Sequence, residues 1–345
     1  MFRLPALLLV LLAAPVAAHA AAPPSSQTDD APPASPGKGS APITPQRTGD
    51  ATVAPQLTGD APGPSRRSDE LPPASPRASR VEAKVASAIA ESAAGWERVK
   101  RASEAFLGTP YRHSPLGEGA GVDADPRLRF DAVDCLTLIE TAIAAGEART
   151  PSEIEPILDD VRYADGTAPA FANRLHLMEA QWIPDLVRKG YLEEATVRLG
   201  GGAVVEESIA YDEKEWRARK KLRGLPWQPS LAGTHLVPYI PLADAARLAP
   251  TLPEGLVINV VRAPVPGAVS LVTHSGLLVI KDGKRYVRHA ALRQAQVIDE
   301  PLEHFIARHA QMRLRKVLGL NLLAVRSNAV RAEKAVAARR LVTGR

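Results

Sequence analysis

The single cysteine of this chain, Cys135, lies where a helix is predicted to begin. A helical pattern runs from Cys135 to about Ala145, Asp134 precedes it as an N-cap, and Gly146 follows as the predicted helix end. Unpaired N–H groups and the positive end of the helix dipole converge at a helix start, so we expect a lowered pKa for the thiol. The thiolate is the nucleophilic form of cysteine. Because a lone cysteine cannot form an internal disulfide, the alternatives are a buried apolar residue or an intermolecular link.

Two histidines, His274 and His289, lie on the two strands of a predicted hairpin with Asp282-Gly283 as its turn. With that turn, Gly276 lies opposite His289, so both histidines project from one face as diagonal neighbours, with Cβ atoms roughly 7 Å apart. One imidazole can act as a general base toward a thiol while the other orients it through a hydrogen bond. The spacing alone allows either assignment of the two roles.

A zinc site is the competing interpretation of the same side chains. Suitable ligand types are supplied by Cys135, His113, His176, His274 and His289. No close pair has the spacing typical of zinc ligands, and the chain has no His-Glu-x-x-His helix. We therefore expect no metal and no other cofactor.

The beginning of the chain, residues 1–20, has the pattern of a secretory signal peptide. Arg3 precedes an apolar run from Leu4 to Ala18, and Ala18-His19-Ala20 matches a cleavage site of small residues. The run is short for a membrane span, which needs ~20 residues. We therefore expect a periplasmic or secreted protein without an integral membrane segment in the mature chain.

The composition divides the rest of the chain into three parts. Residues 21–80 are dominated by Pro, Ala and Ser and lack aromatic residues, so we expect a disordered linker. Residues 326–345 carry mostly basic charges and are predicted to form a solvated helical or frayed tail; contact with anionic envelope polymers is the alternative. The formal net charge is +5, but no aromatic residues interleave with the basic run, so we expect no nucleic-acid partner.

Residues 81–325 are predicted to form one domain of the α+β class. Helical patterns come first and strands rich in Val, Ile and Leu follow from about His235, which predicts helices packed on one side of an antiparallel sheet. The expected helices are 81–106 with a kink at Gly95 and a stop at Gly108, 135–145, 154–161 and 174–189; the expected strands are 235–242, 256–262, 268–280, 284–291 and 318–325.

Several short motifs occur in a fixed order along this domain. They are Gly108-Thr109-Pro110-Tyr111, Val133-Asp134-Cys135-Leu136-Thr137 with Glu140, Arg162-Tyr163, Arg174-Leu175-His176 before Trp182-Ile183, Thr273-His274-Ser275-Gly276-Leu277 and His289-Ala290. In this order they resemble the amidase-like branch of the NlpC/P60 papain-like cysteine peptidase superfamily, also labelled DUF1460. The resemblance covers about residues 81–325.

The resemblance implies a papain-like fold, circularly permuted relative to papain, and a Cys-His-His triad in which His274 is the base and His289 orients it. It implies peptidoglycan or muropeptides as the partner, with an N-acetylmuramoyl-L-alanine amidase or a stem-peptide endopeptidase as the activity. Tyr111 would line the site near the thiol. Three further residues would shape the substrate cleft, namely Arg174, His176 and Trp182. Core packing is the alternative for Tyr111 and Trp182, and an ion pair with an acidic residue is the alternative for Arg174. We expect a monomer.

The chain departs from the family pattern at a few positions. Glu254-Gly255 replaces the usual Gly-Asp, Ser275 follows the first histidine where Val is usual, and Ala291-Leu292 replace small hydroxyl residues after the second. These changes leave the three triad residues in place and bear on substrate specificity. Two other functions fit the same fold, a binding module that holds cell-wall peptides without cleaving them and an acyl transferase acting on lipids or proteins.

Overall fold

The computed structural model describes residues 75–218 and 225–343. The predicted signal peptide, residues 1–20, lies outside the described residues, and so does the predicted linker as far as residue 74. The linker does not reach residue 80, because the chain is helical from Pro76 onward. The Ser75 hydroxyl caps this helix by accepting a hydrogen bond from the N–H of Ala78, and proline is favoured at the first helical position.

The described chain alternates between helical and extended segments. The α-helices are α1 (Pro76–Glu91), α2 (Trp96–Ala105), α3 (Cys135–Glu147), α4 (Ile154–Arg162), α5 (Ile183–Arg188), α6 (Thr196–Gly200), α7 (Glu213–Ala218), α8 (Leu242–Leu248), α9 (Leu302–Ala310) and α10 (Ala329–Thr343). The strands are β1 (Leu192–Glu194), β2 (Val205–Tyr211), β3 (Gly233–Pro241), β4 (Leu256–Arg262), β5 (Val272–Lys281), β6 (Lys284–Ala291), β7 (Gln296–Pro301) and β8 (Val317–Val325).

The strands form one sheet in the order β2-β3-β8-β4-β5-β6-β7, and β1 also pairs with β8. Every strand pairing in the described part of the chain is antiparallel. The predicted α+β class with an antiparallel sheet is therefore confirmed. The bounds predicted for β4 are correct, whereas β1, β2 and β7 were not predicted, because these segments are short or rich in polar residues.

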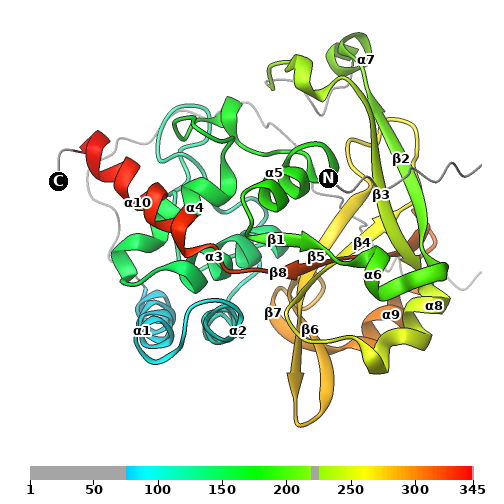
Figure 1. Ribbon diagram of the computed structural model, residues 1–345, viewed down its shortest axis with the longest axis horizontal. Coiled ribbons are helices and arrows are strands. Elements are labelled where there is room, and N and C mark those ends of the chain that lie inside the picture. The colour runs from blue at the N-terminus through cyan, green and yellow to red at the C-terminus, as the bar shows by residue number, and fades with distance from the viewer. Residues whose placement is uncertain (1–74, 219–224, 344–345) are drawn as a thin grey trace, which may run out of the picture. The chain divides into compact units, whose positions relative to one another are not determined.

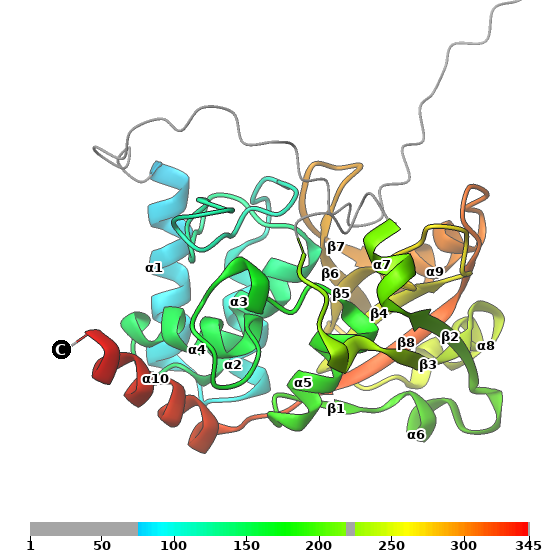
Figure 2. The ribbon, with the colours of Figure 1, turned by 90° about the horizontal axis from the view of Figure 1, so that it is seen from above.

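Helices cover both faces of the sheet, so the prediction of helices on one side only is wrong. Every residue of β4 is buried, which requires cover on both faces. Val257 packs in one cluster with Ile139 of α3, and the next residue, Ile258, packs in another with Phe305 of α9. Figures 1 and 2 show α1 to α4 on one side of the strands and α8 and α9 on the other.

The first helical region contains two helices, where a single kinked helix was predicted. The chain turns between α1 and α2 at Gly95, whose φ of 90° favours glycine. Gly146 does not end α3, which continues to Glu147. A Cβ atom at Gly146 would overlap the side chain of Val99, so this glycine allows α2 and α3 to pack closely.

The segment predicted as a helix over 174–189 is helical only in its second half. Arg174 follows a 3₁₀ turn, η2 (Phe171–Asn173), in extended conformation, and a π-helical turn, η3 (Met178–Trp182), leads into α5. Regular helix therefore begins only at Ile183.

The basic C-terminal stretch is packed against the domain and is not a free tail. Ala332 and Val336 of α10 are buried in the same cluster as residues of α4, and the two helices lie side by side (Figure 1). Arg331 pairs with Asp160 and Asp165. Much of the positive charge of residues 326–343 is thus offset within the domain. Within the described residues, no helix is both long and apolar enough to span a membrane.

Candidate active site

The β5–β6 hairpin has the register that its turn predicts. Asp282 and Gly283 both have positive φ, 49° and 72°, as a two-residue hairpin turn requires, and Lys281 pairs with Lys284. The ladder runs from that pair to Leu277 opposite Arg288 and stops there, although both strands continue. The regular ladder therefore ends at the level of the two histidines.

The first turn of α3 lies at this end of the β5–β6 ladder. α3 contacts both strands, and the backbone N–H of Ser275 lies close enough to the sulfur of Cys135 to lower its pKa. Ser275 directly follows His274 in β5, so the thiol lies against the strand that carries the predicted base. Cys135 and His274 both keep part of their surface exposed, which leaves them open to a substrate.

His274 and His289 converge as predicted. Their Nε2 and Nδ1 atoms are 2.8 Å apart, within hydrogen-bonding distance, and the rings are nearly perpendicular, with an interplanar angle of 84°. His289 is only 2% exposed, whereas His274 reaches the surface. This difference agrees with the assignment of His274 to the reacting position and His289 to the orienting one.

Asp134 caps α3 as predicted. Its carboxylate accepts hydrogen bonds from the N–H groups of Leu136 and Thr137 at 3.1 and 2.8 Å, and the Thr137 hydroxyl accepts one from the N–H of Asp134, which completes a capping box.

The expected lowering of the Cys135 pKa is wrong for the substrate-free protein. Burial raises the pKa of the thiol to about 12, and the charge of Asp134 raises it further. Hydrogen bonds from backbone N–H groups at the helix start and from Ser275 act in the opposite direction but do not outweigh burial. The sulfur therefore carries its proton at neutral pH.

His274 is uncharged for a related reason. Burial lowers its pKa well below 6.5, and the neighbouring side chains of His289, His309 and Arg308 lower it further. A neutral imidazole can accept a proton, which is what a general base must do. The resting site thus pairs a protonated thiol with an unprotonated imidazole.

Tyr111 lies near the thiol, as the resemblance implies. Its N–H donates to the carbonyl of Ala295, and the segment runs parallel to Val133, two residues before Cys135. Burial raises the pKa of the Tyr111 hydroxyl, and the nearby Cys135 and Asp134 raise it further. Its hydroxyl is therefore a hydrogen-bond donor at neutral pH.

Arg174 and His176 both make polar contacts with neighbouring loop residues. Arg174 donates to Glu118 at 2.9 Å through Nε and to Asp123 at 2.9 Å. His176 Nε2 lies 2.7 Å from the carbonyl oxygen of Phe171, and burial lowers its pKa to about 4. Arg174 thus forms the ion pair given as its alternative and binds the loop of Glu118 and Asp123, while His176 binds the backbone of its own segment.

Trp182 has no exposed surface and cannot touch a substrate in this structure. Its indole N–H donates to Glu140 Oε1 at 3.0 Å, and Arg162 donates to the other carboxylate oxygen of Glu140 at 3.1 Å. The expectation that Trp182 shapes the cleft directly is thus replaced by its alternative, core packing. Trp182 joins α3 to the segment that leads into α5.

Sequence reasoning missed the residues that surround the two histidines. Glu300 Oε2 lies 3.1 Å from His289 Nε2, and Arg308 holds the same carboxylate. Phe305 and His309 of α9 lie against the rings, with centroids 6.2 and 6.4 Å from that of His274. The available signal was β7: once it pairs His289 with Ile298, Glu300 falls two residues further along on the same face.

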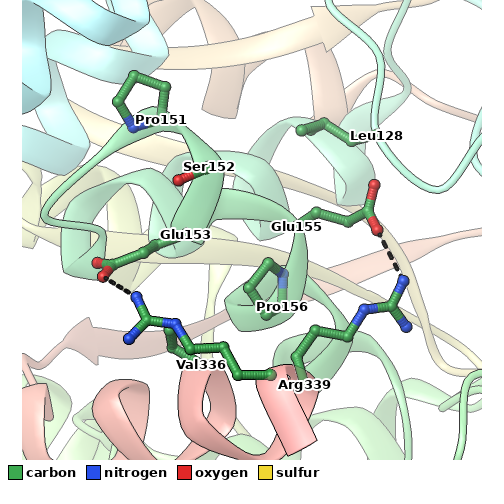
Figure 3. A pocket seen from close by; sticks show the side chains of 9 residues that line it. Leu128, Pro151, Ser152, Glu153, Glu155, Pro156, Val336 and Arg339 are labelled. Carbon is green, nitrogen blue, oxygen red and sulfur yellow. Dashed lines mark hydrogen bonds and ion pairs between the residues drawn. The ribbon is translucent and has the colours of Figure 1, made fainter. Parts of the chain in front are cut away.

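A hollow of about 490 Å³ lies outside this site, between α10 and the segment that begins α4 (Figure 3). Glu153 and Glu155 on one side of it pair with Arg340 and Arg339 on the other. The described residues include no cluster of three His, Cys, Asp or Glu side chains able to hold a metal ion.

A family model with the description "AmiA-like: N-acetylmuramoyl-L-alanine amidase-like" matches residues 101–312 of the sequence. This chain belongs to the AmiA-like family. The matched region of the AmiA-like chain includes Cys135, His274 and His289 together with Glu300 and Arg308.

Solved structures share the fold of this AmiA-like chain. A Legionella pneumophila protein of the DUF1460 family is 20% identical, with a TM-score of 0.61 over 72% of this chain and 97% of that one. Two structures of an N-acetylmuramoyl-L-alanine amidase from Bacteroides uniformis are 22% and 25% identical, with TM-scores of 0.50 and 0.51. They cover 72% and 65% of this chain and 99% and 97% of their own. No curated protein matches the sequence.

Proposed function

We propose that this AmiA-like protein is an exported cysteine hydrolase that cleaves an amide bond of peptidoglycan, in the periplasm or outside the cell. Cys135 is the nucleophile, His274 the base and His289 the residue that orients it, in a site of the permuted papain-like, NlpC/P60 type. The family description favours the bond between N-acetylmuramic acid and L-alanine. The signal-peptide pattern of residues 1–20 supports export.

The reaction proceeds in two balanced halves. His274 takes the Cys135 proton as the sulfur attacks the carbonyl carbon, and the imidazolium then protonates the leaving nitrogen as the C–N bond breaks. A thioester and a free amine result. Water next gives a proton to His274 and attacks the thioester; the C–S bond breaks, and the sulfur regains the proton. The backbone N–H of Cys135 and the Tyr111 hydroxyl are the proposed donors for the oxyanion.

One observation carries the proposal. A thiol at the start of a helix lies against the strand position next to His274, and that imidazole lies 2.8 Å from a buried second imidazole. This placement supports Cys135, His274 and His289 as nucleophile, base and orienting group for acyl transfer by cysteine. The partial exposure of Cys135 and His274, against the burial of His289, supports the division of roles.

The test is mass spectrometry of purified sacculi incubated with the full chain or with Cys135→Ala. We expect the wild-type chain to release intact stem peptides with a free L-alanine amine, and Cys135→Ala to release none while still binding sacculi. Release of truncated stems would assign a stem-peptide endopeptidase to the same site. Binding without release by both chains would identify a binding module, and equal release by both would refute the proposal.

A further inference from the structure

A carboxylate lies behind the two histidines, at the end of the hydrogen-bonded series that starts from His274. Glu300, near the end of β7, has its Oε2 atom 3.1 Å from Nε2 of His289. Arg308 of α9 donates to both oxygens of the same carboxylate, from Nε at 3.0 Å and from Nη2 at 2.8 Å. The Glu300 side chain is 13% exposed, so its position is set by these two partners and not by solvent.

The charge state of Glu300 fixes the direction of its hydrogen bond to His289. Burial raises the pKa of this carboxyl, but hydrogen bonds from His289 and Arg308 outweigh it and hold the pKa at about 2. An ionised carboxylate only accepts hydrogen bonds. His289 must therefore carry its proton on Nε2 and donate it to Glu300.

The direction of this hydrogen bond also determines the direction of the hydrogen bond between the two rings. An imidazole with a single proton has one N–H and one bare nitrogen, so with that proton on Nε2 the His289 ring accepts at Nδ1. The partner at 2.8 Å, Nε2 of His274, must then carry the proton. The remaining nitrogen of His274, Nδ1, is left without a proton and is free to accept one.

Other groups around the rings do not set a different direction. His309 Nδ1 lies 2.8 Å from the carbonyl oxygen of Phe305, so that ring is bound within its own helix. The guanidinium of Arg262 donates to the Thr273 hydroxyl at 2.8 Å and to the carbonyl of Arg315. In the described part of the chain, the two rings make no hydrogen bonds besides those to each other and to Glu300.

We infer that Glu300, clamped by Arg308, is a positioning residue that fixes the tautomers of His289 and His274 and so leaves Nδ1 of His274 as the proton acceptor for Cys135. This inference rests on the proposed function for its role in catalysis. The negative charge of Glu300 also stabilises the imidazolium that forms on His274 when the thiol proton moves.

The test variant is Glu300→Gln, which keeps the shape of the side chain and reverses the direction of its hydrogen bond to His289. Arg308 retains the amide oxygen, so the amide NH₂ faces Nε2 of His289 and donates to it. His289 then carries its proton on Nδ1, and His274 is left with its proton on Nδ1 and no base there. We expect kcat to fall about 10²- to 10⁴-fold with KM nearly unchanged, as for a misplaced tautomer in an acid–base pair. Glu300→Asp should recover at least tenfold of that loss.

Nitrogen-15 NMR of histidine-labelled full chain reads the tautomers without turnover. We expect the wild type to have N–H on Nε2 of both His274 and His289, and Glu300→Gln to move both protons to Nδ1. Glu303→Gln, an exposed position of α9, is the matched control and should change neither spectrum nor rate. A wild-type proton on Nδ1 of His274 would overturn the inference, as would a Glu300→Gln chain that keeps either its tautomers or its full activity. Because the NMR result does not depend on cleavage, a failure of the proposed hydrolase would appear separately, as release of peptides by Cys135→Ala or by neither chain.

Discussion

Two sets of polar side chains were expected at the same site, and they make different kinds of contact. His274 and His289 meet on the β5–β6 hairpin beside Cys135. Arg174 and His176 instead bind partners in their own neighbourhood, Glu118 and Phe171. Both sets consist of residue types that bind substrates or move protons. Residue type alone therefore did not separate the reacting group from the supporting one.

The two sets differ in what their side chains contact. On the hairpin, His274, His289 and Glu300 form a hydrogen-bonded series, and the His274 ring keeps part of its surface exposed beside the thiol. Trp182, the third residue expected to shape the cleft, is buried and donates, as Arg162 does, to the carboxylate of Glu140. Buried hydrogen-bond networks rigidify a structure, whereas a partly exposed ring is available for chemistry. The predictions below test this distinction.

The largest expected effect is the difference in kcat between substitutions of His274 and of His176. His274→Gln should lower kcat about 10³-fold, because it removes the base, while His176→Gln should leave kcat within a few-fold of wild type. Peptide release from sacculi measures both, and circular dichroism confirms the fold of each variant. Comparable losses of kcat in the two variants would erase the distinction between the sets.

The hydrogen bond from Trp182 to Glu140 should contribute to the free energy of unfolding. Trp182→Phe removes the donor to the buried Glu140 carboxylate, so we expect the free energy of unfolding in urea to fall by about 1–3 kcal/mol. Trp227→Phe, at a partly exposed indole, is the control and should change stability less. The activity of the folded Trp182→Phe chain should stay close to wild type. A loss of activity without a loss of stability would instead place Trp182 in the reaction.

The protonation state of Cys135 predicts the pH dependence of its alkylation. With a pKa raised to about 12, the reactive thiolate fraction should grow about tenfold per pH unit from pH 7 to 10 without levelling off. The urea-unfolded chain, with an ordinary thiol pKa of about 8.5, should level off above about pH 9. Rates of iodoacetamide labelling measure both. A flat rate between pH 6 and 9 in the folded chain would indicate a thiolate–imidazolium pair at rest.

Much of the site followed from local sequence signals. Asp282-Gly283 fixed the hairpin register, and with it the shared face of His274 and His289, because side chains alternate along a strand. Asp134 fixed the start of α3 because a capping residue satisfies backbone N–H groups that the helix leaves free. These features depend on residues only a few positions apart.

The parts that were missed depend on contacts distant in sequence. β7 contains charged residues that are typical of a loop in sequence. In the fold, Asp299 pairs with Arg288 and Glu300 pairs with Arg308. The pKa of Cys135 depends on burial by the whole domain, which opposes the helix-start effect that the sequence displays. The cover of the second sheet face by α9 likewise becomes visible only once Phe305 packs on it.

In the proposed reaction, peptidoglycan cleavage passes through a thioester on Cys135. Acid quenching during turnover of muropeptides, followed by mass spectrometry of the peptide that contains Cys135, tests this step most directly. We expect a muramoyl-type or peptidyl acyl group on that sulfur, present while substrate remains and gone when it is exhausted. An acyl group on another residue, or turnover by the Cys135→Ala chain, would contradict it.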